Sequence, residues 1–419
     1  KVMFVSYYTY FVVVALLIFG GKFSKGKGNF HQDSTSLEVT KSLRGFAALG
    51  VILHHISQQN AFQHANGWNK PGELGLFVNV GFFFVAIFFF CSGYGLIKSL
   101  NTKENYLDGF IKKRIVKTIV IPFYINVILY AIFNVITGVK LAPARWLCNF
   151  LGLTLMNEYA WYPVVLTLLY LAFYFIFKNI KNRKLCFTLM LVIILLQGVI
   201  FCINGHFAWW TGPKNWWLNQ TAIQHSKWWT QEKVIWFFGE WWVNSSIAFL
   251  IGMLFAHNEE KIRHWFEKHY YLKVILIAVL VLAFNFVSSL AQWKLGYWSE
   301  WNGKGPGIVN KLVCYLSQLP QVTVFVILIF AIMLKYYAKN PILNFFGNLS
   351  FETYMMNLMA IKILEFIITK PVRYTGAPVS VEKWRLAVNE VSVIALTIIL
   401  GLIFKWISKL VTNKLFNKR

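Results

Sequence analysis

The sequence has 419 residues, of which 57% are hydrophobic, and its mean hydropathy is +0.53. Soluble globular proteins contain about 45–50% apolar residues, so this composition excludes an ordinary soluble protein. The formal net charge of +25 does not indicate a nucleic-acid partner, because most Lys and Arg lie in short segments between apolar runs. We therefore expect a protein of the lipid bilayer that binds no nucleic acid.

Eleven stretches are candidate membrane spans. A helix needs about 20 apolar residues to cross about 30 Å of hydrocarbon at 1.5 Å per residue. The candidates lie near residues 2–21, 44–57, 75–97, 118–138, 159–177, 185–203, 241–256, 274–291, 312–334, 345–369 and 389–404. We expect the second helix to begin earlier, near Leu37, and the first to be an uncleaved span because no small-residue cleavage pattern follows it. The sequence thus predicts an all-α, polytopic transmembrane helical bundle of about 11 spans.

Positive charge alternates between the connections. The basic set of connections comprises residues 22–44, 98–117, 178–184, 257–273, 335–339 and the tail 405–419. This set holds 26 Lys and Arg in 87 residues, whereas the other connections hold 13 in 115 residues. Cytoplasmic loops are enriched in Lys and Arg, so the basic set is expected in the cytoplasm. Eleven spans then place the N-terminus outside and the C-terminus in the cytoplasm, for a protein of the cell (plasma or inner) membrane.

The five cysteines are scattered, and most of them lie beside apolar runs. No Cys-x-x-Cys or Cys/His spacing is present, so we interpret them as small hydrophobic residues and expect no metal site.

Arg44 and His55 lie on the second predicted helix, eleven residues apart. Eleven residues make about three turns plus 20°, so the two side chains share one face, with His55 about 16 Å deeper in the membrane. His54 points about 80° away. An ionisable group at this depth is costly and is a functional candidate. The alternative is that His55 only hydrogen-bonds neighbouring helices. Between Arg44 and His55 lie small residues that allow a neighbouring helix, or a thin ligand, to approach closely. They are Gly45, Ala47, Ala48 and Gly50.

The segment RGFAALGVILHH (44–55) resembles the first core helix of the integral-membrane acyltransferase family 3, which includes O-antigen and other polysaccharide O-acetyltransferases. That family carries an Arg, ten residues and a His on this helix, which correspond to Arg44 and His55. Three later segments are similar to family motifs in the same order: GFFFVAIFFFCSGYGL (81–96), FIKKRIVKTIVIPFY (110–124) and FFGNLSFETYMMN (345–357). The family has ten core helices, so the resemblance implies an acyltransferase transmembrane core over residues 37–410. Residues 1–36 are then an extra N-terminal span with a basic cytoplasmic loop, and residues 411–419 are a cytoplasmic basic tail.

Two departures from the family pattern concern single residues. Relatives often have His where Asn357 stands, and many have a Glu that is missing from WYPVVLTLLYLAFY (161–174). The first departure puts a second histidine role in doubt. The second indicates a divergent branch, so the acceptor cannot be inferred from that of well-known relatives.

Acyl transfer from a thioester to a sugar hydroxyl needs a base for the hydroxyl proton. A neutral imidazole suits this role, so His55 is the candidate base. Arg44 is better placed to orient the phosphates or the pantetheine end of an acyl-CoA donor, because about 16 Å is too far for contact with the reacting carbonyl.

Four residues define the basic edge: Lys112, Lys113, Arg114 and Lys117. These residues are expected to face the cytoplasm and to bind the CoA phosphates, although ordinary positive-inside charge is the alternative. The acyl-CoA, with acetyl as the expected acyl group, is a donor substrate, and no permanently bound cofactor is expected.

Further polar residues are candidates for lining a substrate tunnel or supporting the site, although Ser92 and Tyr94 could merely cap their helix. They are Ser92, Tyr94, Glu352, Tyr354 and Asn357. Glu352 would orient Arg44 or His55 by pairing with either, and Ser350 could cap its helix.

Tryptophan is concentrated in the loop 204–240 and the start of the next span, which hold nine of the 18 Trp residues. Indole rings stack on sugar rings, so paired Trp residues are candidates for binding the acceptor. The pairs are Trp209 and Trp210, Trp216 and Trp217, and Trp228 and Trp229. An interfacial aromatic belt is the alternative.

Together these features predict a membrane-embedded O-acyltransferase that moves an acyl group from cytoplasmic acyl-CoA to a glycan hydroxyl of the cell envelope. A transporter or flippase of an envelope precursor and a non-catalytic membrane binding protein are the alternatives. Transporters often show inverted repeats, and none is recognisable here. The partner could be a second copy of this chain in a homo-oligomer or an accessory acceptor-binding protein, and the sequence does not decide between them.

Overall fold

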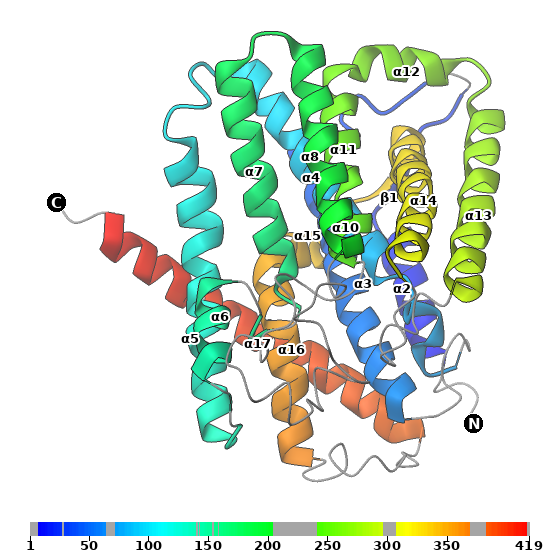
Figure 1. Cartoon of the computed structure of the whole chain (residues 1–419). Coiled ribbons are helices and arrows are strands. Elements are labelled where there is room, and N and C mark those ends of the chain that lie inside the picture. Colours follow the sequence, from blue (N-terminus) through cyan, green and yellow to red (C-terminus); the bar gives the residue numbers. More distant parts are fainter. Residues whose placement is uncertain are drawn as a thin grey trace. The chain divides into compact units, whose positions relative to one another are not determined.

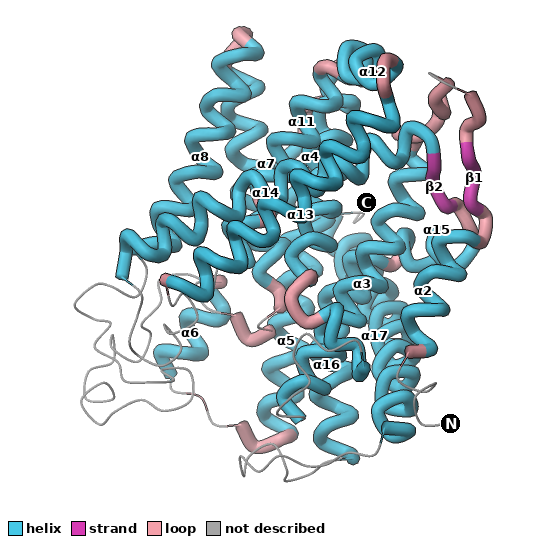
Figure 2. Tube along the Cα trace, turned by 90° about the vertical axis from the view of Figure 1, so that its right-hand side faces the viewer, coloured by secondary structure: helices cyan, strands magenta, loops and turns pink. Residues whose placement is uncertain are grey.

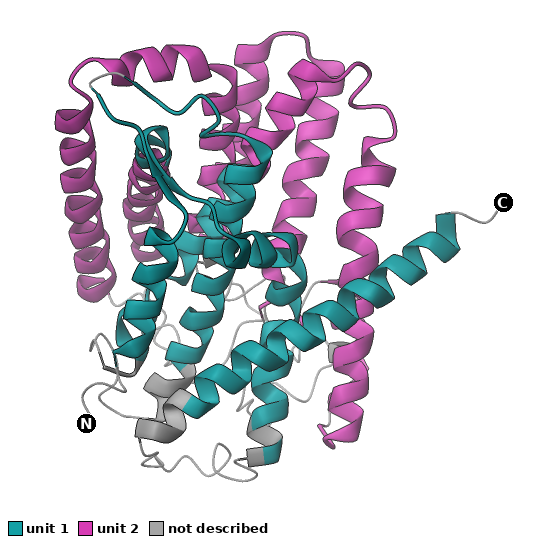
Figure 3. Ribbon diagram, turned by 180° about the vertical axis from the view of Figure 1, so that it is seen from behind, with its two compact units in different colours: residues 1–91, 330–419 teal, residues 92–329 magenta. Residues whose placement is uncertain are grey.

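The computed structural model divides into two compact units. The described residues are 7–26, 29–63, 72–139, 141, 143–152, 155–157, 159–203, 241–295, 307–368 and 383–416. Unit 1 comprises residues 1–91 and 330–419, and unit 2 comprises residues 92–329 (Figure 3). In the described part of the chain both units are helical, apart from one short two-stranded sheet in unit 1. The all-α class is thus confirmed.

Unit 1 is built around the helix that carries Arg44 and His55. Its elements are α2 (Tyr8–Ile18), β1 (Gly21–Phe23), α3 (Leu37–Gln63), the 3₁₀ helix η1 (Gly72–Phe77), the start of α4 (Gly81–Thr102), the end of α14 (Gly307–Lys335), β2 (Tyr336–Ala338), α15 (Pro341–Asn348), α16 (Ser350–Ile368) and α17 (Lys383–Phe416) (Figure 1). Helix α3 contacts η1, α15, α16 and α17.

Helix α3 begins at Leu37, as expected, because Ser36 caps it: the Ser36 Oγ accepts a hydrogen bond from the Val39 amide at 3.3 Å. Leu49, Ile52, Leu53 and Ile56 recur at helical spacing and form one apolar face. This face packs in a core with residues of α2, η1, α15, α16 and α17, namely Leu16, Leu74, Phe346, Ile361 and Val393.

Two glycines let α3 and α15 approach backbone to backbone. A Cβ atom added at Gly45 would collide with the carbonyl of Leu343, and one added at Gly347 would collide with the carbonyl of Lys41. Gly50 faces the ring of Phe84 on α4. The sequence left two alternatives for this stripe of small residues, the close approach of a neighbouring helix or of a thin ligand. At Gly45 and Gly50 the contacts are with neighbouring helices of the protein.

The sheet joins the segment after α2 to the segment after α14, an association that sequence patterns did not predict. Strands β1 and β2 pair antiparallel, with Gly21 opposite Ala338 (Figure 2). Beside the sheet, the Tyr337 hydroxyl donates to Asp33 at 2.8 Å. This bond holds the pKa of Asp33 below its usual range, and burial together with the bond raises the pKa of Tyr337 to about 12. The described residues of the basic connection after α2 are therefore a folded part of unit 1.

Unit 2 contains most of the long apolar helices. Its elements are the end of α4, the π-helix η2 (Ile111–Val120), α5 (Ile121–Ile136), α6 (Pro143–Leu151), α7 (Trp161–Asn179), α8 (Arg183–Ile203), α10 (Trp241–Asn244), α11 (Ile247–His257), α12 (Glu259–Glu267), α13 (Tyr270–Lys294) and α14 up to Ile329. Helix α12 lies across the ends of α11 and α13, which it joins (Figure 1). Its first carboxylate, Glu259, binds Lys98 at 2.8 Å and Arg263 at 2.9 Å.

Seven helices of the described chain are long and apolar enough to cross a membrane, as a polytopic membrane protein requires. Each corresponds to one predicted span. These helices cover Gly81–Thr102, Ile111–Ile136, Trp161–Asn179, Arg183–Cys202, Tyr270–Lys294, Val309–Lys335 and Val388–Phe416.

The other four predicted spans fall on helices that are shorter or more polar. Residues 2–21 contain the 11-residue helix α2, and residues 241–256 contain α10 and α11, which are separated by Ser245 and Ser246. Residues 345–369 fall on α15 and α16 with a break at Leu349, and residues 44–57 lie within the 27-residue helix α3. The exact number of spans therefore stays a prediction.

Candidate functional site

Arg44 and His55 share one face of α3, because this helix is α-helical without a break from Leu37 to Gln63. His55 is only 7% exposed, whereas Arg44 is half-buried. In the described part of the chain no carboxylate forms an ion pair with Arg44. The guanidinium is thus a half-buried cation that an anionic ligand can neutralise.

The imidazole of His55 belongs to a chain of hydrogen bonds across three helices. Its Nδ1 lies 2.7 Å from the Oδ1 of Asn357 on α16, and the Asn357 Nδ2 donates to the Thr397 Oγ1 on α17 at 3.3 Å. Asn357 and Thr397 are both fully buried. Because Asn357 turns its Nδ2 towards Thr397, its Oδ1 accepts from the Nδ1–H of His55. The lone pair of the neutral imidazole is then on Nε2.

His54 points in a different direction and has a different partner. Its Nδ1 lies 2.8 Å from the carbonyl oxygen of Phe77 at the end of η1, and its ring packs against Gly81 at the start of α4. His54 therefore joins η1 and α4 to α3, as a structural histidine does.

The predicted supporting residues of α16 lie in unit 1 with His55. Tyr354 is buried, and the carboxylate of Glu352 lies 3.8 Å from the Nζ of Lys405 on α17. The ion pair that Glu352 forms in the structure is thus with Lys405. It is not with Arg44 or His55, the two partners suggested by the sequence. Ser350 is the first residue of α16, and its hydroxyl donates back to the Gly347 carbonyl at 3.2 Å.

Ser92 and Tyr94 lie in unit 2, on α4. The Ser92 hydroxyl is 3.3 Å from that of Tyr162 on α7, and the Tyr94 hydroxyl donates to Glu259 on α12 at 2.5 Å. Because Glu259 also binds Lys98 and Arg263, Tyr94 contributes to the attachment of α12 to α4. Their role in lining a tunnel stays a prediction.

The basic edge also lies in unit 2, on η2. Lys112, Lys113 and Arg114 are exposed and Lys117 is half-buried. A π-helix of this length is rare, and π-helical geometry often occurs at functional sites. Lys113 and Arg114 line a surface hollow with residues that precede η2.

The acceptor candidates Trp209, Trp210, Trp216, Trp217, Trp228 and Trp229 lie outside the described residues. The cysteines carry free thiols, and no group of three His, Cys, Asp or Glu side chains that could hold a metal ion occurs in the part of the chain that the structure describes.

Thr397 and Glu259 were not among the residues predicted from the sequence. Thr397 was recognisable in principle as a polar residue within the apolar run VIALTIIL (393–400) of the last predicted span. Its relation to Asn357, forty residues away, is a tertiary contact with no local signal. Glu259 lies in a connection whose Lys and Arg were counted only for topology.

Comparisons with known proteins give one match. The family profile described as an acyltransferase domain, that of acyltransferase family 3, matches residues 41–408. The match begins within α3 and ends within α17, so it includes Arg44, His55, Asn357 and Thr397. Neither a curated protein nor a solved structure matches the chain.

Proposed function

Because the chain belongs to the integral-membrane acyltransferase family 3, we propose that it is an O-acyltransferase that moves an acyl group, acetyl first of all, from cytoplasmic acyl-CoA to a hydroxyl of an extracytoplasmic or lipid-linked glycan. The observation that carries this proposal is the hydrogen-bonded chain His55–Asn357–Thr397. A buried imidazole held in one tautomer by a second residue is the arrangement that a general base requires.

The proposed reaction uses His55 as the base. Its Nε2 removes the proton of the acceptor hydroxyl while the hydroxyl oxygen attacks the thioester carbonyl. The C–O bond of the new ester forms, the C–S bond breaks, and CoA leaves as a thiolate that takes the proton from Nε2. Asn357 accepts from Nδ1–H throughout and so stabilises the imidazolium that forms between the two proton transfers.

Arg44 is proposed to bind the donor. It lies on the same face of α3 as His55 and about 16 Å away, and no carboxylate of the described chain neutralises it. A guanidinium can bind a phosphate group with two parallel hydrogen bonds. The extended pantetheine arm of an acyl-CoA can bridge the distance between a phosphate at Arg44 and a thioester at His55.

The remaining parts of the proposal concern the membrane and the acceptor. We place the protein in the cell membrane with eleven spans, an outside N-terminus and a cytoplasmic C-terminus, as the alternation of charge indicates. The paired Trp residues of the 204–240 loop are proposed to stack on the sugar rings of the acceptor. The ten-helix core over residues 37–410 is proposed on the family resemblance.

The test of the function is acyl transfer by purified protein from labelled acetyl-CoA, with coenzyme A release and product measured separately. His55→Ala should reduce the rate about 10²–10⁴-fold, the usual effect of losing a general base, while donor binding persists. The matched control is His54→Ala, whose imidazole contacts the Phe77 carbonyl, and its rate should change far less. If His55→Gln, which retains hydrogen bonding but cannot act as a base, is fully active, the proposed role of His55 is wrong.

A further inference from the structure

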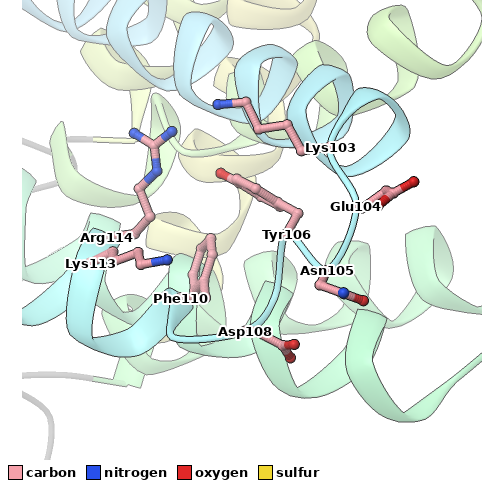
Figure 4. A pocket seen from close by; sticks show the side chains of 8 residues that line it. All are labelled: Lys103, Glu104, Asn105, Tyr106, Asp108, Phe110, Lys113 and Arg114. Carbon is pink, nitrogen blue, oxygen red and sulfur yellow. The ribbon is translucent and has the colours of Figure 1, made fainter.

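A hollow of about 370 Å³ lies on the surface of unit 2, where the chain passes from α4 to η2. Its wall includes two aromatic rings and three basic side chains, namely Tyr106, Phe110, Lys103, Lys113 and Arg114. Figure 4 shows these side chains together with Glu104, Asn105 and Asp108, which complete the lining. The volume lies in the range of sites that bind small organic ligands, about 300–1,000 Å³.

The aromatic part of the wall is held from behind. The ring of Phe110 is 1% exposed and stacks on Tyr174 of α7, with centroids 5.9 Å apart. Tyr106 meets Phe110 edge to face at 5.7 Å. The Tyr106 hydroxyl is buried and has no hydrogen-bond partner among the described residues. A ligand that accepts a hydrogen bond would satisfy this hydroxyl.

The charged part of the wall is mainly positive. The guanidinium of Arg114 lies over the Tyr106 ring, 5.9 Å from its centroid. Glu104 and Asp108 also line the hollow, and in the view of Figure 4 their carboxylates lie on the side away from Arg114 and from the Tyr106 hydroxyl. One side of the hollow thus offers basic groups and a hydroxyl donor, and aromatic rings adjoin them. This combination can bind a phosphate group that is attached to a planar ring.

From this chemistry we propose that the hollow binds the nucleotide end of the acyl-CoA donor, a phosphorylated adenosine, with its 3′-phosphate at Lys103, Lys113 and Arg114 and its base against Tyr106. The inference rests on the proposed function and deepens it. It selects two residues of the basic edge, because Lys113 and Arg114 line the hollow whereas Lys112 and Lys117 do not.

The probe is adenosine 3′,5′-bisphosphate, which represents the nucleotide end of CoA without its acyl arm. Its binding to the purified full chain is measured by calorimetry and by competition with labelled acetyl-CoA. Lys113→Gln and Arg114→Gln should each weaken binding about tenfold or more, the usual effect of losing a charge-assisted hydrogen bond. The matched control is Lys112→Gln, which removes the same charge from an exposed position beside the hollow and should leave affinity within about twofold.

Tyr106 separates stacking from simple charge attraction. Tyr106→Leu removes the ring and should weaken bisphosphate binding about tenfold, as alanine substitution of a base-stacking aromatic does. Tyr106→Phe keeps the ring and should lose only the share due to the hydroxyl. If both variants bind as the wild type does, no base stacks there and the inference is wrong.

Other outcomes show whether the phosphate comes from a nucleotide or from a lipid headgroup, and whether the inference fails independently of the proposed function. Equal weakening in Lys112→Gln, or competition by anionic lipid vesicles as strong as by the bisphosphate, would overturn the inference in favour of unspecific charge or a lipid headgroup. Normal acetyl transfer with unchanged donor KM in Arg114→Gln would overturn it while leaving the proposed function intact. Bisphosphate binding with the expected variant pattern, in a protein that transfers no acyl group, would support the hollow and contradict the proposed function.

Discussion

At the scale of single residues, position 357 determines how His55 is held. An amide stands where relatives often have an imidazole, and its Oδ1 accepts from His55 while its Nδ2 reaches Thr397. An amide provides one acceptor and two donors without a charge, so it can fix the tautomer of His55 without competing for the proton. Asn357 is therefore a positioning residue for the proposed base.

We expect Asn357→Leu to reduce the rate of acyl transfer about 10–100-fold, because it leaves the Nδ1–H of a buried imidazole without its acceptor, at a cost of about 1–3 kcal/mol. The measurement is kcat and donor KM with acetyl-CoA. A positioning role predicts a lower kcat with an unchanged donor KM, and Asn357→His, the side chain of relatives, should restore part of the rate. Because a loss of folded protein also lowers the apparent kcat at an unchanged KM, kcat is expressed per folded protein, with the folded fraction measured by size-exclusion chromatography in detergent. Unchanged kcat in folded Asn357→Leu would contradict the role.

Arg44 provides the second prediction at this scale. Its guanidinium has no carboxylate partner in the described chain, so Arg44→Ala should weaken acetyl-CoA binding about tenfold or more, as charge-assisted hydrogen bonds are worth about 1.5–3 kcal/mol. Arg44→Lys should recover only part of the affinity, because an ammonium cannot form the two parallel bonds. Calorimetric titration with acetyl-CoA provides the readout, and His55→Ala, which keeps Arg44, is the control with retained affinity. Wild-type affinity in Arg44→Ala would remove Arg44 from donor binding.

At the scale of elements, the contact between α3 and α15 holds in place the helix that carries Arg44 and His55. It depends on Gly45 and Gly347, where an added Cβ would meet the backbone carbonyls of Leu343 and Lys41. A hydrogen bond of 2.7 Å from Ser42 to the Asn344 side chain adds to it. Since backbone atoms cannot move aside as a side chain can, the two helices would have to separate.

Gly45→Ala and Gly347→Ala should therefore each lower the free energy of unfolding by about 1–3 kcal/mol, the usual cost of overpacking. The change is measured as a lower midpoint of thermal unfolding in detergent. Gly95→Ala on α4 is the matched control, because a Cβ added there meets no atom within 4 Å, and alanine has the higher helix propensity. A midpoint for Gly45→Ala equal to that of the control would mean that the close approach of α3 and α15 does not occur.

The elements also show which features a sequence makes predictable. The start of α3 at Leu37, the shared face of Arg44 and His55 and the seven long apolar helices follow from local patterns of capping and hydropathy. The bond from His55 to Asn357 joins residues 302 positions apart, and the pairing of β1 with β2 joins segments of three residues each. Neither leaves a periodic signal, because each depends on the tertiary packing of distant segments.

At the scale of the whole molecule, contacts within each unit bear on the proposed topology. In unit 1, β1 pairs with β2, and so joins the connection before α3 to the connection after α14. In unit 2, Lys98 at the end of α4 pairs with Glu259 after α11. All four segments belong to or adjoin the basic set of connections, which charge alone assigns to the cytoplasm. The pairings support the proposal, because connections that touch must lie on one face of the membrane.

The N-terminal helix is the element on which the orientation of the chain ends depends. Helix α2 has 11 residues, about 16 Å, which is roughly half the hydrocarbon thickness. It is nevertheless anchored in unit 1, because the Glu390 carboxylate of α17 accepts from the Tyr8 hydroxyl at 2.6 Å and from the Thr9 hydroxyl at 2.5 Å. A buried carboxylate with two donors fixes the start of α2 to α17.

We expect Lys1 and Arg419 to lie on opposite faces of the membrane, with Lys1 outside and Arg419 in the cytoplasm, because the alternation of basic connections over the eleven proposed spans indicates it. The measurement is labelling of Lys1→Cys and Arg419→Cys in intact cells by a thiol reagent that does not cross membranes, in a background with the five native cysteines replaced. Only Lys1→Cys should react before the cells are opened, and both should react afterwards. A cysteine in the 98–117 connection, such as Asn101→Cys, is the control for a cytoplasmic position. Labelling of both chain ends in intact cells would contradict the orientation, and labelling of neither would mean that α2 does not cross and that the chain has ten spans.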